Sequence, residues 1–182
     1  MTDYTDKDLL AFFRIEEKKH YAFNSLVGKY QERIYWHIRK LLINHEDTDD
    51  VVQNTFIKVW NNLADFREAS QLYTWIYRIA TNEALTFLNQ KKRKFFLPIV
   101  DYEKELINSL EADEFFSGDE IQLKLQKAIL GLPEKQRVVF NLKYFEEMKY
   151  EEMAVILDTS VGALKASYHH AVKKIEKYLE SN

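Results

Sequence analysis

Three side chains of different chemistry share one predicted helical face in the middle of the chain. Trp75, Arg78 and Asn82 are spaced by three and four residues, which brings side chains together on a helix. An aromatic ring can stack on a base, a guanidinium can hold a phosphate, and an amide can read a base edge. This combination suits single-stranded nucleic acid. The alternative is that Trp75 belongs to the hydrophobic core.

Polar and basic segments flank this face on both sides. Residues 66–74 form a polar loop with aromatic residues around it, and this loop contains Arg67 and Ser70. Four consecutive bases follow the face at 91–94. They could bind phosphates, but a basic run at a helix C-terminus is also favoured by the helix dipole.

A second candidate surface begins with an acidic cluster. Glu46, Asp47, Asp49 and Asp50 stand at the predicted start of a helix. Carboxylates there complement the helix dipole and cap free N–H groups, which is one interpretation. Because four carboxylates exceed what capping needs, the other interpretation is a negative docking surface for a basic partner.

The third candidate is a helix-turn-helix near the C-terminus. Apolar residues follow a helical spacing over 149–157 and again from Val161 to about residue 179. Between them, Asp158 tolerates a left-handed backbone and Ser160 is a good N-cap. In such a motif the second helix enters the DNA major groove. Its outward side chains would be Lys165, Ala166, His169, His170 and Lys173. The alternative is a plain helical hairpin with a solvated polar face.

The elements that must position these residues are predicted to be helices. The chain has only four Gly and two Pro in 182 residues, too few for the turns of a β-rich fold. Apolar residues recur at spacings of three and four in three stripes. These stripes consist of Leu26, Tyr30, Ile34, Ile38, Leu41 and Leu42; of Val52, Phe56, Val59 and Leu63; and of Leu72, Ile76, Ala80, Ala84 and Leu88.

The predicted fold class is all-α, with two small helical domains joined by an acidic linker. We expect a helical bundle over 1–97, a linker over 98–127 in which any helix is transient, and a helix-turn-helix domain over 128–182. The linker carries eight carboxylates against three lysines, so its net charge is −5, while the flanking domains carry +2 and 0. The overall charge of −3 therefore does not speak against nucleic-acid binding.

Enzyme, metal and membrane classes find no support in the sequence. The absence of cysteine excludes thiolate catalysis and Cys-ligated metals, and Glu17–His20 is the one Glu-x-x-His segment, so a di-iron ligand set is incomplete. We predict no catalytic residue, no metal, no cofactor and no enzyme activity. The longest stretches without charge have nine residues, against the about 20 needed to span a bilayer. With no signal peptide at its acidic N-terminus, the chain is expected in the cytoplasm, without membrane insertion.

Together, these segments resemble regions 2 and 4 of bacterial extracytoplasmic-function (ECF) sigma factors. The resemblance to region 2 rests on DTDDVVQNTFIKVW at 47–60 and LYTWIYRIATN at 72–82. The resemblance to region 4 rests on LPEKQRVVF at 132–140 and on the segment from YEEMAVIL at 150–157 through Lys174. The two matches occur in this order on either side of the acidic linker.

The resemblance implies a sigma factor that binds core RNA polymerase, recognises −10 and −35 promoter elements and helps to separate the strands. Carried over by position, the polymerase-binding residues are Asp49, Asp50, Gln53, Phe56 and Trp60. The residues that contact −10 DNA are Arg67, Ser70, Trp75, Arg78 and Asn82, and those that contact −35 DNA are Lys165, Ala166, His169, His170 and Lys173. The implied partners are core RNA polymerase and promoter DNA, and an anti-sigma factor is a further partner that this family admits.

One departure from the family and one alternative function remain open. Many family members carry Arg at positions 167 and 170, where this chain has Ser167 and His170, so it has fewer bidentate readers of guanine. The alternative function is a stand-alone helix-turn-helix transcriptional regulator. It would explain 128–182 but not the acidic helix start, the Trp75 face and the basic run together.

Overall fold

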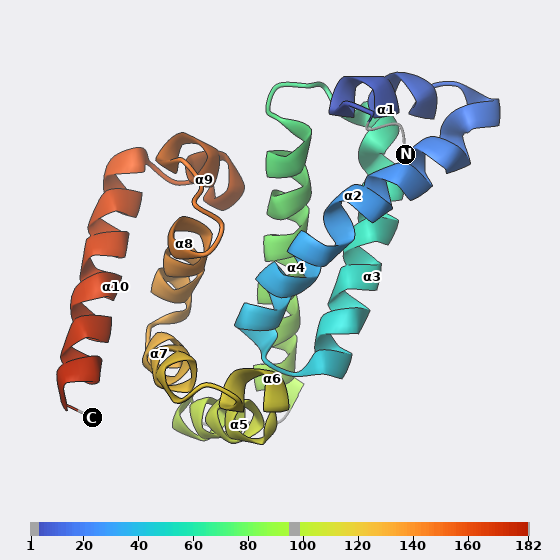
Figure 1. Cartoon of the computed structure of the whole chain (residues 1–182). Helices are drawn as coiled ribbons and strands as arrows, with labels where there is room; N and C mark the ends of the chain where they lie inside the picture. The colour runs from blue at the N-terminus through green and yellow to red at the C-terminus, as the bar shows by residue number, and fades with distance from the viewer. Residues whose placement is uncertain (1–3, 95–98, 182) are drawn as a thin grey trace.

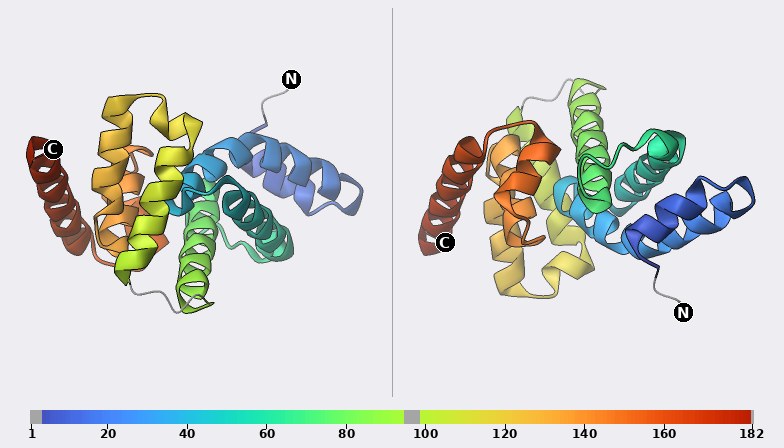
Figure 2. Two further views of the ribbon diagram at one scale, coloured as in Figure 1. Left: turned by 90° about the horizontal axis from the view of Figure 1, so that it is seen from below. Right: turned by 90° about the horizontal axis from the view of Figure 1, so that it is seen from above.

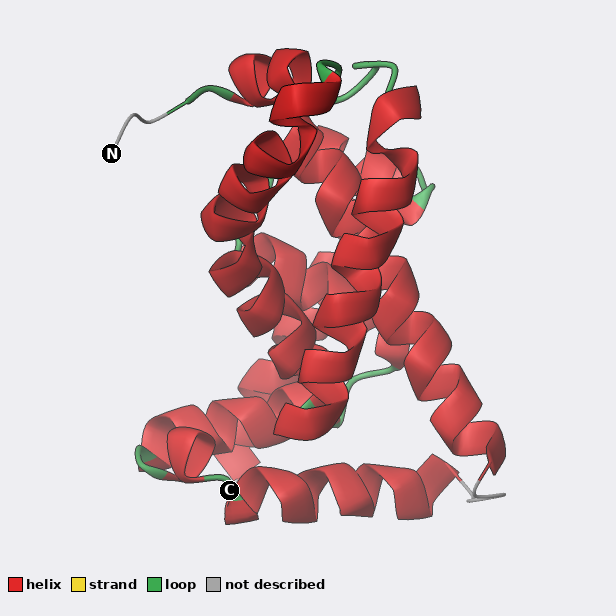
Figure 3. Ribbon diagram, turned by 90° about the vertical axis from the view of Figure 1, so that its right-hand side faces the viewer, coloured by secondary structure: helices red, strands yellow, loops and turns green. Residues whose placement is uncertain are grey.

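The computed structural model describes residues 4–94 and 99–181, and within these residues the regular structure is entirely helical (Figure 3). None of the helices in this part of the chain is long and apolar enough to cross a membrane. The first four helices form an N-terminal bundle, and the remainder forms a C-terminal half (residues 99–181) that lies against it (Figure 1).

The N-terminal bundle is built around one long helix. Its members are α1 (Asp6–Phe13), α2 (Glu16–Leu42), α3 (His45–Asn62) and α4 (Leu72–Lys94), with a short 3₁₀ turn η1 (Leu63–Asp65) after α3. Helix α2 packs against the other three, and α3 packs against α4. Every residue of the three predicted apolar stripes is buried except Val52, which is half-buried, so the predicted core is confirmed.

The segment predicted as a linker is helical where the structure describes it. It contains α5 (Ile99–Ala112), α6 (Glu114–Ser117) and the first part of α7 (Glu120–Leu130). The predicted boundary after residue 127 falls inside α7, and the predicted start at Pro98 lies outside the described residues.

Burial explains why this acidic segment is ordered rather than transiently helical. Leu106, Leu110 and Phe116 are buried, which gives the linker helices an apolar face. Asp113 forms an ion pair with Arg39 of α2, whose guanidinium also lies 5.2 Å from the centre of the Phe116 ring. The acidic segment is therefore attached to the bundle by both charge and packing.

The C-terminal domain contains the predicted helix-turn-helix, and the structure confirms its local geometry. It comprises α7, α8 (Glu134–Tyr144), α9 (Tyr150–Leu157) and α10 (Val161–Ser181). Asp158 adopts the left-handed conformation expected at the turn, with φ 49° and ψ 52°. The Ser160 hydroxyl accepts a hydrogen bond of 3.2 Å from the Ala163 N–H, so Ser160 caps α10.

The two halves share one hydrophobic core. Helix α4 packs against α9, and α2 packs against α8. Val138, Met153 and Ile156 of the C-terminal domain belong to the same buried cluster as the three stripes of the N-terminal bundle. A smaller second cluster, which includes Ile129 and Phe140, holds α7, α8 and α10 together. Figure 2 shows α10 at the opposite end of the molecule from α1.

A buried histidine lies at the centre of the N-terminal bundle. His37 of α2 is 1% exposed, and its Nε2 lies 2.9 Å from the Thr81 hydroxyl of α4. Its Nδ1 has no hydrogen-bond partner among the described residues. Burial, reinforced by the positive charge of Lys40, lowers the pKa of His37 from 6.5 to about 3. This imidazole is therefore neutral in the folded protein across the neutral pH range.

We expect acid to destabilise the protein through His37. Below pH 6.5 the unfolded chain binds a proton at this residue that the folded chain does not bind until pH falls to about 3. Stability is therefore unaffected by this group above pH 6.5, and it falls by about 2 kcal/mol as pH drops by about 1.5 units below that value. Urea unfolding at a series of pH values measures this slope.

The matched variants for this experiment are His37→Gln and His170→Gln. His37→Gln should flatten the slope between the two pH limits, whatever its effect on stability at neutral pH. His170 is exposed on α10, so its replacement should leave the slope in place. Equal slopes in the two variants would contradict the assignment to His37.

Candidate partner and nucleic-acid interfaces

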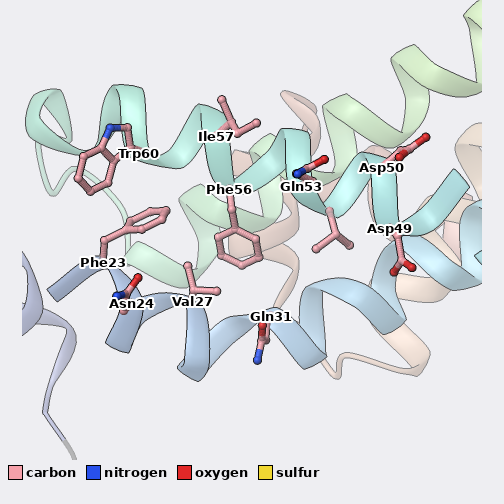
Figure 4. Close-up of a pocket in the computed structure, with 11 residues that line it drawn as sticks. Phe23, Asn24, Val27, Gln31, Asp49, Asp50, Gln53, Phe56, Ile57 and Trp60 are labelled. Atoms are coloured by element: carbon pink, nitrogen blue, oxygen red, sulfur yellow. The ribbon is translucent and has the colours of Figure 1, made fainter. Parts of the chain in front are cut away.

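A groove runs between α2 and α3 on the surface of the N-terminal bundle (Figure 4). Its volume is about 710 Å³, and six of its eleven lining residues are apolar. All five residues predicted to bind polymerase line it, so the structure brings that set together. The lining residues are Phe23, Asn24, Val27, Gln31, Asp49, Asp50, Val52, Gln53, Phe56, Ile57 and Trp60.

The acidic end of the groove is not explained by helix capping. The N-cap of α3 is Asn44, whose side-chain oxygen accepts a hydrogen bond of 2.9 Å from the Asp47 N–H. Asp47 in turn forms an ion pair of 2.7 Å with Lys91 of α4. Asp49 and Asp50 lie beyond the first turn and are exposed, with a contact of 3.4 Å between Asp49 and His45. The capping interpretation therefore accounts for the start of the cluster but not for these two carboxylates.

The opposite end of the groove is aromatic. Trp60 is half-buried and makes edge contacts with Phe13 and Phe23, at ring-centre distances of 5.3 and 5.0 Å. His20 stacks on its other side at 5.0 Å. In Figure 4, Trp60 and Phe23 lie at one end of the groove, and Asp49 and Asp50 lie at the other. The groove thus joins an apolar floor, fixed by ring packing, to an acidic rim.

A second pocket lies where the loop before α4 meets that helix. It has a volume of about 390 Å³, and it contains four of the five residues predicted to contact −10 DNA: Arg67, Ser70, Trp75 and Arg78. The Trp75 ring is half-buried and packs on Phe66, with ring centres 5.1 Å apart. Trp75 is therefore part core and part pocket wall, which combines the two interpretations drawn from the sequence.

Asn82 and the basic run lie outside this pocket. Asn82 is exposed on α4, one turn beyond Arg78, so it extends the same face without lining the pocket. In the basic run, Lys91 pairs with Asp47 and lies 3.9 Å from Glu105, and Lys92 forms an ion pair with Glu134. Arg93 and Lys94 are exposed. Half of the predicted phosphate-binding run is therefore already paired with carboxylates.

The outer face of α10 presents the residues predicted to contact −35 DNA. Lys165, Ala166, His169, His170 and Lys173 are all exposed. The opposite face is buried through Leu164, Ala171 and Ile175, which fixes the orientation of the helix. The Lys165 ammonium lies 5.7 Å from the centre of the Tyr150 ring, at the start of α9. The structure therefore places the five residues on one accessible helical surface.

Sequence reasoning missed the residues that α2 contributes to the groove. Phe23, Val27 and Gln31 are spaced by four and lie beside the buried stripe that begins at Leu26. Their spacing was the available signal, but a helix with two adjacent apolar stripes does not reveal which stripe faces a groove. Val155 of α9, which lines the pocket with Trp75, was also missed, because that contact depends on how the two halves pack.

Comparison with known proteins gives two matches to family models in the predicted order. Residues 26–94 match sigma-70 region 2, and residues 122–175 match sigma-70 region 4. The first range contains the groove on α3 and the pocket at α4. The second contains the helix-turn-helix.

Relatives of known name match along almost the whole chain. The RNA polymerase sigma-H factor of Pseudomonas aeruginosa is 31% identical over 99% of this chain and 96% of its own length. The ECF RNA polymerase sigma-E factor of Escherichia coli is 30% identical over 92% of this chain and 91% of its own. The ECF sigma factor SigW of Bacillus subtilis is 29% identical over 87% and 89%, respectively.

Two solved structures share the fold. One is CnrH in complex with the cytosolic domain of CnrY, with a TM-score of 0.70 and 24% identity over 97% of this chain and 98% of that one. The other is the sigma factor RpoE of Bartonella quintana in complex with the anti-sigma factor NepR, with a TM-score of 0.68 and 19% identity over 87% and 96%. With the identity to full-length relatives, these findings show that the chain belongs to the ECF group of RNA polymerase sigma factors.

Proposed function

We propose that this chain binds core RNA polymerase through the groove between α2 and α3 and directs it to promoters. The observation that carries the proposal is the groove itself, where Gln53, Phe56 and Trp60 line an apolar floor and Asp49 and Asp50 form its rim. An apolar groove of this kind suits an amphipathic helix laid into it. The acidic rim favours a partner helix that carries basic residues beside its apolar face.

The pocket at the start of α4 is proposed to receive an unstacked base of the −10 element. The half-buried Trp75 ring offers a stacking surface, Arg67 and Arg78 offer positive charge for the strand, and Ser70 offers a hydroxyl. Asn82 continues this surface along α4, where its amide can read a further base edge. A base held there cannot pair with the opposite strand, so binding at this pocket helps to keep the strands apart.

The exposed face of α10 is proposed to read duplex DNA at the −35 element. Lys165 and Lys173 supply phosphate contacts, which position the helix without reading sequence. His169 and His170 can hydrogen-bond to base edges, and the methyl group of Ala166 can contact a thymine methyl. Since guanidinium groups are absent from these five positions, readout rests more on shape and apolar contact than on bidentate pairing with guanine.

The proposed function needs no catalytic residue or cofactor in this chain, because core RNA polymerase carries out the chemistry. It also places the protein in the cytoplasm, with the polymerase and the chromosome. Both structures that share the fold hold a sigma factor or a related chain with a bound protein partner, which supports an anti-sigma factor as a further partner. The alternative, a stand-alone regulator, gives no role to the groove between α2 and α3.

The first test concerns the acidic rim of the groove. Replacing Asp49 and Asp50 by Lys should weaken binding to core polymerase by about tenfold or more, because it reverses the charge that favours a basic partner. The free energy of unfolding should change by less than about 0.5 kcal/mol, since Asn44 supplies the cap of α3. Competition with a labelled parent protein for core polymerase measures the first quantity, and urea unfolding measures the second.

Glu46→Lys is the matched control for this test. Glu46 is an exposed carboxylate on the same helix, but it does not line the groove. Its reversal should leave polymerase binding near the parent level. Equal losses in the control and the double variant would attribute the effect to net charge rather than to the groove, and the docking assignment would fail.

The second test separates polymerase binding from strand opening. Arg78→Ala and Asn82→Ala should leave binding to core polymerase unchanged but lower the yield of open complexes on a cognate promoter by about tenfold. Such a promoter can be found by sequencing the DNA that co-purifies with the complex between this protein and polymerase. Permanganate reactivity of unpaired thymines and run-off transcription measure the opening.

Gln90→Ala provides the control, because Gln90 is an exposed amide farther along α4 and outside the pocket. Unchanged open-complex formation in Arg78→Ala and Asn82→Ala would remove the −10 assignment. Tight, sequence-specific binding to duplex DNA without polymerase, together with no transcription in its presence, would favour the stand-alone regulator.

A further inference from the structure

The proposed −10 pocket is closed on one side by the C-terminal half of the chain. Val155 of α9 lines it together with Trp75 and Arg78, although Val155 lies far along the chain from them. Helix α9 packs against α4, the helix that carries the pocket residues. An incoming DNA strand would therefore meet an apolar side chain of the helix-turn-helix at the place where a base is expected to lie.

A buried carboxylate holds this arrangement together. Glu146 lies between α8 and α9, and its side chain is 8% exposed. It accepts a hydrogen bond of 2.5 Å from the Tyr77 hydroxyl, and it lies 3.6 Å from the Arg33 guanidinium and 4.0 Å from the Lys40 ammonium. These three partners all belong to the N-terminal bundle, so the contacts span the two halves.

The electrostatic surroundings agree with a closed contact. Burial and the Glu146 carboxylate raise the pKa of the Tyr77 hydroxyl, so Tyr77 remains a hydrogen-bond donor at neutral pH. Burial lowers the pKa of Lys40, while Glu146 acts in the opposite direction. Lys40 also lies 4.7 Å from the centre of the Phe145 ring, the residue before Glu146. The carboxylate therefore has several partners in a partly desolvated site.

The basic run at the end of α4 is masked by the same half of the chain. Glu105 of α5 lies near Lys91, and Glu134 of α8 pairs with Lys92. These carboxylates occupy cations that a phosphate backbone would otherwise use. In contrast, the −35 face of α10 is exposed, as described above, so only one of the two proposed DNA surfaces is covered.

We propose that the C-terminal half closes the single-strand DNA surface of the N-terminal bundle in the free protein, with Glu146 as the latch. The identity of that surface rests on the proposed function, but the latch itself does not. Opening returns Glu146, Arg33 and Lys40 to water, which offsets much of the lost contact energy, so the latch can be reversible. A partner that binds the open form more tightly shifts the chain toward it.

The test measures the distance between the two halves in the full chain. Because the chain has no cysteine, cysteines introduced at the exposed positions Glu17 and Lys177 are its only thiols and can carry a donor–acceptor dye pair. Glu146→Gln removes the charge that Arg33 and Lys40 require, and Tyr77→Phe removes the hydroxyl donor. Both should lower the efficiency of energy transfer. Glu147→Gln, at the exposed neighbour, should match the parent.

A second measurement asks whether the latch masks the DNA surface. The probe is a dye-labelled, mixed-sequence single-stranded DNA, followed by fluorescence anisotropy without polymerase. Glu146→Gln should bind it about fivefold more tightly than the parent, because affinity rises with the fraction of chains in the competent form. Glu147→Gln should bind it as the parent does. Circular dichroism of each variant verifies that the helices remain folded.

The outcomes distinguish the latch from the proposed function. Unchanged energy transfer in both Glu146→Gln and Tyr77→Phe would overturn the latch. Lower transfer without a gain in single-stranded DNA binding would overturn the masking role. In either case, promoter-specific transcription by the parent protein with core polymerase would leave the sigma-factor function intact. Loss of that transcription, with the latch variants behaving as expected, would instead overturn the function alone.

Discussion

The burial of helix α2 on several sides is the constraint on which the rest of the structure depends. Its stripe through Leu26, Ile34 and Ile38 enters the core of the N-terminal bundle. A neighbouring strip, with Phe23 and Val27, forms one wall of the polymerase groove. Toward its C-terminal end, positive side chains face the linker and the C-terminal domain. A change in the rotation of this one helix would therefore alter the core, the groove and the closure together.

The charge of the chain has a structural order that its total of −3 conceals. The acidic segment between the two regions does not extend freely into solvent where the structure describes it. Instead, Asp113 pairs with Arg39, Glu111 with Lys127, and Glu105 lies near Lys91. The segment thus neutralises cations on both sides of it, and two of these contacts hold the linker helices against the N-terminal bundle.

Local sequence predicted local structure well, and it failed where the outcome depended on packing between distant segments. The turn at Asp158, the cap at Ser160 and the apolar stripes follow from neighbouring residues, and all are confirmed. The order of the linker was missed, because net charge outweighed the spacing of Leu106 and Leu110 in the analysis. Residues such as Val155 acquire a place in a site only when α9 meets α4, and no spacing along the chain encodes that meeting.

The unequal exposure of the two DNA surfaces has a consequence for how the chain behaves in a cell. Replication and repair continually expose single strands, which have aromatic-accessible bases and no sequence requirement for stacking. A free sigma chain with an open strand pocket would be drawn away to those sites. With Val155 beside that pocket and α10 outside, the chain ignores such decoys while its duplex-reading helix stays available. Closure therefore protects the supply of initiation-competent protein.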